Sequence, residues 1–312
     1  MSIPVLDFGA CSLQNEPDVS DEQLCSLSEE MKTAFLKVGF VFLKNTGITE
    51  EEVARVMDIS KKFFLQPEEL KKPFSRGNFP NSVNHGWVSM ETERLNPRRP
   101  GDLKESFNLT SLDPDTKWPS SEDVKDFQEI LTSFYQRCKE LSLRLLRVMA
   151  LSLGLDPEVL LSAHRFIGTD VNSTTLRSLY YQPVNSEKAK QDQVRCGEHS
   201  DFGTFTLLFQ GSEGLQVQNR SGDFVCAPCI PGTVLINIAD LMQRWTSDQF
   251  VSVVHRVLLP SNGDSSTRQS MAFFVHPDDE ALITCCDGSN KYPPITAGDY
   301  LAERFKNSYG QT

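Results

Sequence analysis

A pattern of apolar residues at every second position in the second half of the chain constrains the fold more strongly than any other feature. Phe205, Leu207 and Phe209 follow this pattern, and in a β-strand alternate side chains point to the same face. The segment VSVVHRVLL at 251–259 is rich in β-branched residues and is typical of another strand. From about residue 174 onward, we therefore expect a mainly β core.

Two histidines and one aspartate lie on these strand-like segments. His199 and Asp201 are two residues apart, so one short strand can present both to the same point, and His255 lies within the later strand. Two histidines and a carboxylate are the ligand set of the facial triad that holds non-haem Fe(II) and leaves positions open for chemistry. Because these ligands bind a metal only when deprotonated, the metal affinity should fall at low pH.

A second pair, Arg268 and Ser270, is also spaced to share one face of a strand. A guanidinium matches a carboxylate in a bidentate manner, and the serine hydroxyl can add a third hydrogen bond. Either pair alone is common on protein surfaces. Their conjunction, in this order and on strand-like segments, points to an oxygen-activating enzyme with a carboxylate-bearing co-substrate.

The first half of the chain favours helices, which we expect at 20–39, 49–65 and 121–155. Gly39 is a stop signal for the first, and Thr49 with Glu52 forms a capping box that starts the second. The third has apolar residues at three-and-four spacing and should pack against the β core. The segment 76–119 is rich in Pro, Asn, Gly and charge, so we expect loops that contribute to a pocket wall.

With these motifs, the chain resembles the 2-oxoglutarate- and Fe(II)-dependent dioxygenases, in the branch that contains isopenicillin N synthase, gibberellin oxidases, anthocyanidin synthase and thymine dioxygenase. The similarity spans nearly the full length, from IPVLDF at 3–8 through FLKVGFVFLKNTGI at 35–48 to LRSLYYQP at 176–183. One departure is Leu179, which stands where relatives often have an asparagine near the co-substrate.

The resemblance implies a double-stranded β-helix, or jelly roll, with helices packed outside. It implies His199, Asp201 and His255 as catalytic iron ligands, with Arg268, Ser270 and Tyr181 on the distal carboxylate of 2-oxoglutarate. The implied reaction couples decarboxylation of 2-oxoglutarate, to succinate and CO2, to hydroxylation or a related C–H oxidation of a small organic molecule. O2 is the other co-substrate, and ascorbate is a candidate reductant.

Candidate substrate contacts follow from the strand that carries Arg268. Phe274 and His276 are an even number of positions after Arg268, so all three side chains should point to the same face of the strand. Relatives place substrate-contacting residues there, although a core role suits Phe274 equally well. Weaker candidates are Trp87, Phe202 and Arg177. For His164 we favour a surface or packing role, and for His85 a structural or exposed role over a substrate contact.

Three alternatives stay open at this point. The first is an Fe(II) oxidase of the isopenicillin N synthase type, which uses O2 without 2-oxoglutarate. The second is a zinc hydrolase, because the same ligands suit Zn²⁺, although the chain has no HExxH motif. The third is a metal-free binding protein on the same fold.

Composition favours one structural unit with a large core, since the 312 residues are 39% hydrophobic. Within it we expect a mixed α/β region at 1–120, a long helix with a connection at 121–172, the jelly-roll core at 173–278 and a C-terminal extension at 279–312.

The net charge of −11 argues against nucleic acid or anionic membranes as partners. A small-molecule substrate is expected, and no obligate protein partner is evident.

The eight cysteines are scattered and do not form the framework of a small secreted protein. The sequence shows no signal-peptide pattern and no run of 18 apolar residues. We therefore expect a cytoplasmic protein.

Overall fold

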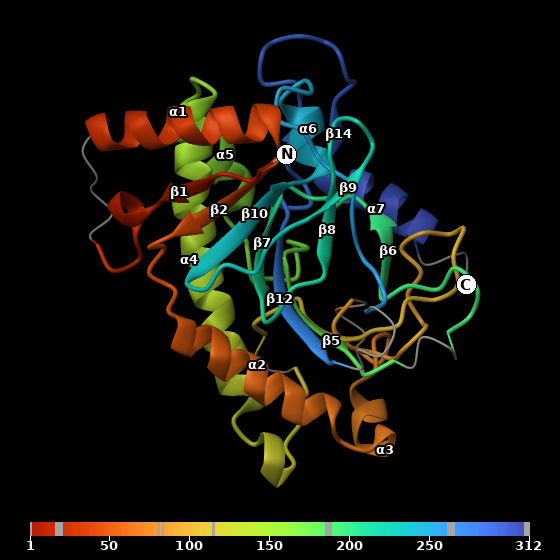
Figure 1. Cartoon of the computed structure of the whole chain (residues 1–312). Helices are drawn as coiled ribbons and strands as arrows, with labels where there is room; N and C mark the ends of the chain where they lie inside the picture. Colours follow the sequence, from red (N-terminus) through yellow and green to blue (C-terminus); the bar gives the residue numbers. More distant parts are fainter. Residues whose placement is uncertain are drawn as a thin grey trace.

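Two β-sheets of unequal size face one another at the centre of the fold (Figure 1). The computed structural model describes residues 2–15, 21–79, 82, 84–113, 116–184, 189–260 and 266–308. The larger sheet contains, in spatial order, β1 (Val5–Asp7), β2 (Phe40–Lys44), β10 (Thr233–Ile238), β7 (Phe205–Gln210), β12 (Arg268–Val275), β5 (Thr175–Tyr181), β4 (Glu105–Leu109) and β3 (Gly86–Val88). Apart from the parallel β1–β2 pair, its strands pair antiparallel.

The smaller sheet has the order β6 (Cys196–His199), β11 (His255–Val257), β8 (Leu215–Gln218) and β9 (Phe224–Cys226). Buried residues of both sheets form one apolar cluster between them, for example Phe42 and Leu235 from the larger and Val217 and Val257 from the smaller. A short hairpin, β13 (Leu282–Ile283) and β14 (Ile295–Thr296), lies apart. The mainly β core with flanking helices is therefore confirmed, and its two facing sheets form the predicted jelly roll.

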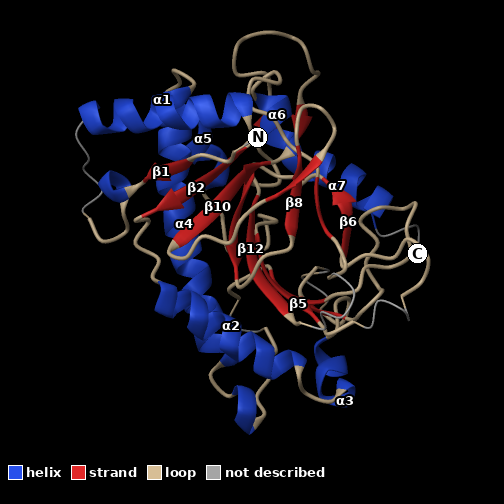
Figure 2. Ribbon diagram, viewed as in Figure 1, coloured by secondary structure: helices blue, strands red, loops and turns tan. Residues whose placement is uncertain are grey.

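Three long helices lie together on one side of the larger sheet (Figure 2). They are α1 (Asp21–Lys37), α2 (Glu50–Phe64) and α4 (Phe127–Ser152). Their apolar faces and one face of the larger sheet enclose the main core. Shorter helices complete the fold: α3 (Glu68–Lys71), α5 (Pro157–Leu161), α6 (Asp240–Trp245), α7 (Ala297–Ser308) and the 3-10 turns Gly9–Cys11, Lys72–Phe74, Glu122–Val124 and Ser162–His164.

The helix signals in the sequence are largely confirmed. The capping box is present, since Thr49 Oγ1 accepts from the Glu52 backbone at 3.1 Å and the Glu52 carboxylate accepts from the Thr49 backbone at 2.7 Å. Gly39 ends the α1 segment at φ +74°, and a Cβ there would lie 2.3 Å from the Val251 carbonyl oxygen. The helix expected from residue 121 begins instead at Phe127. A separate 3-10 turn, Glu122–Val124, precedes it and buries the side chain of Val124.

The expectation of loops throughout 76–119 is wrong for two segments, because β3 and β4 extend the larger sheet there. Every residue of β4 is buried, including Glu105, Ser106 and Asn108. Polar residues buried on a strand abolish the alternation by which a half-exposed strand is identified. The composition of β4 therefore did not predict a strand, because its buried polar side chains have partners far away in the sequence.

Both His164 and His85 are in the core, which favours the packing and structural roles over the exposed ones. His164 is fully buried, and its ring nitrogens bond to the Leu160 carbonyl at 2.7 Å and the Thr204 hydroxyl at 2.8 Å. His85 is buried among aromatic rings, 4.6 Å from Phe79 and 5.6 Å from Phe107 between ring centroids. Within the described part of the chain, neither of its ring nitrogens has a hydrogen-bond partner.

Replacing His85 with phenylalanine should make the free energy of unfolding less dependent on pH. Burial lowers the pKa of His85 to about 4, so below pH ~6.5 the unfolded state takes up a proton that the folded state refuses. The native protein therefore loses stability as pH falls from ~6.5 towards ~4. Denaturant unfolding at pH ~7.5 and ~5 should show a loss about 2 kcal/mol smaller in the variant.

The matched control is His164→Phe. Burial also lowers the pKa of His164 to about 4, but this substitution removes two hydrogen bonds and should be destabilising at both pH values. If His85→Phe loses as much stability on acidification as the native protein, our account of His85 is wrong.

Candidate metal and co-substrate site

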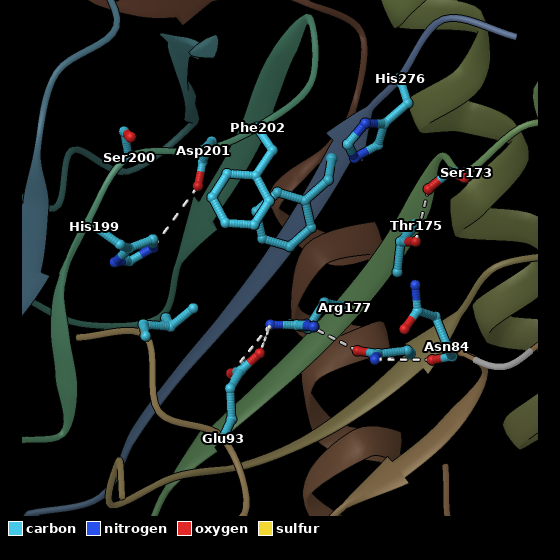
Figure 3. A pocket seen from close by; sticks show the side chains of 13 residues that line it. Asn84, Glu93, Ser173, Thr175, Arg177, His199, Ser200, Asp201, Phe202 and His276 are labelled. Atoms are coloured by element: carbon cyan, nitrogen blue, oxygen red, sulfur yellow. Dashed lines mark hydrogen bonds and ion pairs between the residues drawn. The ribbon is translucent and has the colours of Figure 1, made fainter. Parts of the chain in front are cut away.

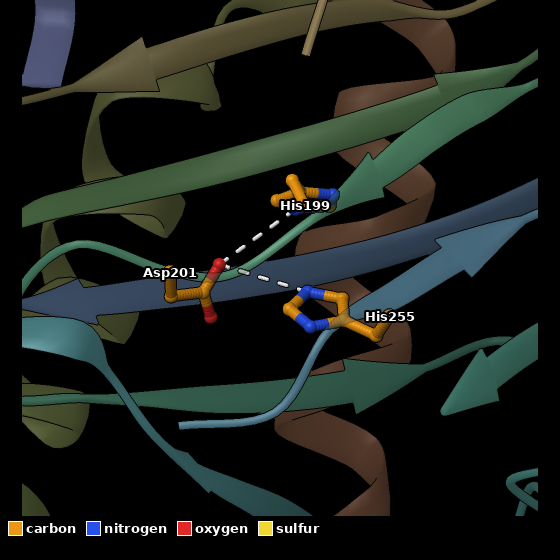
Figure 4. Close-up of side chains that lie close together, drawn as sticks. All are labelled: His199, Asp201 and His255. Carbon is orange, nitrogen blue, oxygen red and sulfur yellow. Dashed lines mark ion pairs between the residues drawn. The ribbon is translucent and has the colours of Figure 1, made fainter. Parts of the chain in front are cut away.

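The three residues of the proposed triad meet at the edge of the smaller sheet (Figure 4). His199 ends β6 and His255 begins β11, and the two are paired directly across the antiparallel ladder. Asp201 follows β6 after one intervening residue. Its Oδ1 lies 3.7 Å from His199 Nε2 and 3.6 Å from His255 Nε2. One ligand atom from each residue lies within 4.8 Å of the others, so a single ion can contact all three.

The backbone fixes the orientation of both imidazoles. His199 Nδ1 bonds to the Gly197 carbonyl at 2.8 Å, and His255 Nδ1 bonds to the Val253 carbonyl at 3.1 Å. A ring that donates through Nδ1–H carries its lone pair on Nε2, and this is how protein partners orient metal-binding histidines. Burial and the nearby His199 lower the pKa of His255 to about 4, so this ring is a neutral ligand near pH ~7.

The larger sheet holds the carboxylate of Asp201. Its Oδ2 accepts bonds from the Thr206 hydroxyl on β7 at 2.6 Å and from the Asn237 amide on β10 at 2.7 Å. Burial acts to raise the pKa of Asp201, but His255, His199 and these two hydrogen bonds outweigh it and keep the pKa low. Sequence reasoning missed Thr206 and Asn237, although each is a polar residue within an otherwise apolar strand.

An inner cavity extends from the triad between the sheets. Arg268, Ser270 and Tyr181 line it, together with Leu179. Arg268 is 3% exposed, and its guanidinium lies 5.0 Å from the centre of the Tyr181 ring. Burial raises the pKa of Tyr181 to about 12, which keeps the phenol protonated as a donor.

The hydrogen-bond partners of Arg268 are all uncharged among the described residues. The guanidinium donates to the Glu213 carbonyl at 3.1 Å, to Ser270 Oγ at 3.2 Å and to Gln210 Oε1 at 3.3 Å. A buried cation without a carboxylate partner is costly unless an anion joins it. The cavity therefore has a positive charge available for an anionic group of a small molecule.

An outer cavity also adjoins the triad (Figure 3). Four of the candidate substrate contacts line it: Arg177, Phe202, Phe274 and His276. Sequence reasoning missed the seven other residues of its wall, which are Asn84, Glu93, Leu95, Asn108, Ser173, Thr175 and Ser200. The two cavities share His199 and Asp201 of the triad, and Leu95, Arg177 and Phe274 also line both.

Trp87 lies outside both groups of lining residues. Its indole N–H donates to Glu105 Oε2 at 2.7 Å, and the Lys71 ammonium lies 5.0 Å from the ring centre. The backbone explains this position, because β3 pairs Trp87 with Phe107 within the larger sheet. The structure thus offers no support for Trp87 as a substrate contact.

Comparisons with known proteins agree with this geometry. Residues 172–277 match the model of the 2OG-Fe(II) oxygenase superfamily, and residues 3–129 match the model described as non-haem dioxygenase in morphine synthesis N-terminal. The 2-oxoglutarate-dependent dioxygenase htyE of Aspergillus rugulosus is 32% identical over 307 residues, which cover 91% of this chain and 90% of that protein. The chain belongs to the 2OG-Fe(II) oxygenase superfamily.

Other proteins are similar to this chain over most of their length. Proline hydroxylase buaE of Petromyces alliaceus is 30% identical, with 90% of this chain and 93% of that protein covered. A full-length Neurospora crassa protein, whose crystal structure was solved in complex with alpha-KG, is 31% identical. It superposes with a TM-score of 0.84, covering 97% of this chain and 95% of that one.

The chain is therefore a 2-oxoglutarate- and Fe(II)-dependent oxygenase that uses O2, and the predicted family, jelly-roll fold and cofactors are confirmed. The comparisons favour this activity over that of an oxidase independent of 2-oxoglutarate. Among the helices that the structure describes, none has the length and apolar character needed to cross a bilayer.

Proposed function

We propose that His199, Asp201 and His255 hold the catalytic Fe(II). The observation that carries the proposal is the convergence of three ligand atoms within 4.8 Å, with the second polar atom of each side chain already bonded to the protein. Two neutral imidazoles and one carboxylate leave positions open on an octahedral ion. The fit of the donor set to Fe(II) is thus good.

We further propose that Arg268, Ser270 and Tyr181 bind the distal carboxylate of 2-oxoglutarate. Arg268 is a buried cation with only uncharged partners among the described residues, and Ser270 and the protonated Tyr181 line the same cavity. A charge-assisted pair formed away from water is strong. Because the triad lines this cavity too, the keto-acid end of the same molecule can reach the iron position.

The bound Fe(II), with 2-oxoglutarate and O2, supplies the oxidising power for a C–H bond of the substrate, and succinate and CO2 are released. The chain's own residues perform the remaining tasks. The triad fixes the place of reaction, and Arg268 fixes the orientation of the co-substrate. The apolar wall, which includes Leu179 and Phe274, excludes water from the reaction.

The substrate is proposed to be a small organic molecule bound in the outer cavity by Arg177, Phe202, Phe274 and His276. Two aromatic side chains supply apolar surface, whereas Arg177, Asn84 and Asn108 supply polar edges. The Neurospora crassa protein has also been solved in complex with alpha-KG and thymine, a flat molecule with polar edges. The similarity of the two chains supports a substrate of that size.

We also propose the cellular location, the reductant and the partners of the enzyme. A cytoplasmic location suits an enzyme that needs 2-oxoglutarate, reduced iron and reduced thiols, and ascorbate suits it as a reductant. The net charge of −11 supports the absence of nucleic acid and membrane partners. We propose that the chain works as one structural unit without an obligate protein partner.

Anaerobic addition of Fe(II) and then 2-oxoglutarate to the metal-free protein tests the site. We expect a weak visible absorption band when the keto acid chelates the iron, and succinate formation once air and a substrate are added. Iron binding without the band would contradict the co-substrate site and favour the oxidase alternative. A protein that binds no iron would contradict the triad.

A further inference from the structure

Four buried charges lie together between the inner and outer cavities. They are Glu93, Asp102, Lys104 and Arg177, which we call the buried quartet, and their side chains are 13% exposed or less. The Lys104 ammonium pairs with Glu93 at 2.9 Å and with Asp102. Arg177 pairs with Glu93 at 3.0 Å (Figure 3). Two positive and two negative groups give the quartet no net charge.

Glu93 and Arg177 of this quartet form part of the wall of the outer cavity. A further polar contact of Arg177 is with an uncharged group, since its Nε donates to Asn108 Oδ1 at 2.8 Å. Asn108 in turn donates to the Asn84 carbonyl at 2.9 Å. The wall therefore presents donors and acceptors in a fixed arrangement, with the charge of its arginine cancelled by Glu93.

Arg268 in the inner cavity provides the contrast. That guanidinium has only uncharged partners among the described residues and is suited to an incoming carboxylate. Arg177 is also largely buried but is paired with a carboxylate of the protein itself. Both arginines line the inner cavity, but among the described residues only Arg268 is without a carboxylate partner.

Other cations near the outer cavity are paired as well. Arg304 of α7 lies over the Phe202 ring at 4.9 Å and pairs with Asp240. Arg99 and Arg256 both pair with Glu198, at 2.7 and 2.9 Å, beside the ligand His199. An anionic substrate would lose its hydration in the outer cavity. These described cations would not compensate for that loss, because each already pairs with a carboxylate of the protein.

We propose that the outer cavity selects an uncharged polar substrate, such as one with an amide group, over a carboxylate, and that Glu93 determines this specificity by neutralising Arg177. The inference rests on the proposed function, because it takes the outer cavity as the substrate site. An amide can accept from an arginine and donate to a carboxylate at once, whereas a carboxylate beside Glu93 would be repelled.

Benzamide and benzoate are suitable probes, because they have the same shape and differ in charge. Their dissociation constants are measured by ligand-observed NMR on the protein loaded with Zn²⁺, as a non-reactive replacement for Fe(II), and with excess 2-oxoglutarate. We expect benzamide to bind at least about tenfold more tightly than benzoate. In Glu93→Gln, the charge of Arg177 is no longer offset by Glu93, which should strengthen benzoate binding at least about tenfold and remove or reverse the preference.

Glu91→Gln is the matched control, since Glu91 lies in the same segment but is exposed and pairs with Lys190. It should keep the native preference. Loss of one partner from a buried ion-pair network is destabilising, so Glu93→Gln with Lys104→Met is made alongside. That double substitution keeps the net charge of the quartet at zero but still removes the carboxylate that pairs with Arg177, so it should lose the preference for benzamide as Glu93→Gln does.

The proposal is overturned if the native protein binds benzoate as tightly as benzamide, or binds no benzamide at its solubility limit. It is also overturned if folded Glu93→Gln keeps the native ratio. Binding of 2-oxoglutarate is measured in the same samples. Failure of that binding contradicts the proposed co-substrate site, whereas the ratio of the two probes reports on the pairing of Arg177 with Glu93.

Discussion

His255→Ala is expected to lower the affinity for Fe(II) by at least about 100-fold and to abolish succinate formation. Removing a residue that only orients a metal ligand costs about 10–100-fold in affinity, and His255 contributes the ligand atom itself. Its Nε2 lies 3.6 Å from Asp201 Oδ1, so the substitution removes one of the three converging donors. Iron content after dialysis and single-turnover succinate yield are the measurements.

His85→Phe serves as the control for this substitution, because His85 is a buried histidine that lines neither cavity. It should keep its iron and its turnover. If His255→Ala retained full iron content and activity, the assignment of the triad would have to be abandoned.

Arg268→Ala is expected to raise the KM for 2-oxoglutarate about 10- to 100-fold. A hydrogen bond to a charged group contributes about 1.5–3 kcal/mol, which corresponds to this range of affinity. The free energy of unfolding should change much less, because the lost partners are uncharged. Steady-state kinetics with varied 2-oxoglutarate and denaturant unfolding separate the two effects.

Arg268→Lys sharpens this test. Lysine keeps the positive charge but lacks the planar fork that matches a carboxylate, so its KM should lie between those of the native protein and Arg268→Ala. An unchanged KM in Arg268→Ala would contradict the role of this residue in binding the distal carboxylate.

The residues of the triad and of the arginine pair could be predicted because they obey local rules. His199 and Asp201, like Arg268 and Ser270, are two positions apart next to or within a strand, where spacing alone predicts a shared face. The apolar alternation of β7 and the β-branched run around His255 identified the strands near them. The chemistry of these side chains then limited the ligands that they can bind.

The outer cavity could not be predicted in the same way. Glu93 and Arg177 are 84 residues apart and meet only because β3, β4 and β5 lie side by side. The composition around Glu93 favoured a loop, and buried polar residues removed the strand pattern of β4. Trp87 was a weaker candidate for a substrate contact, and in the structure β3 pairs it with Phe107 within the larger sheet.

The distribution of the triad over the two sheets has a mechanical consequence. Both histidines belong to the smaller sheet, whereas Thr206 and Asn237 tie Asp201 to the larger one. An ion bound by all three is therefore a crosslink between the two halves of the jelly roll. The space between the halves is also where the co-substrate would lie, so the affinity for the ion and the affinity for 2-oxoglutarate both depend on the distance between the sheets. Loosening the sheets would release the ion and widen the co-substrate's cavity at the same time.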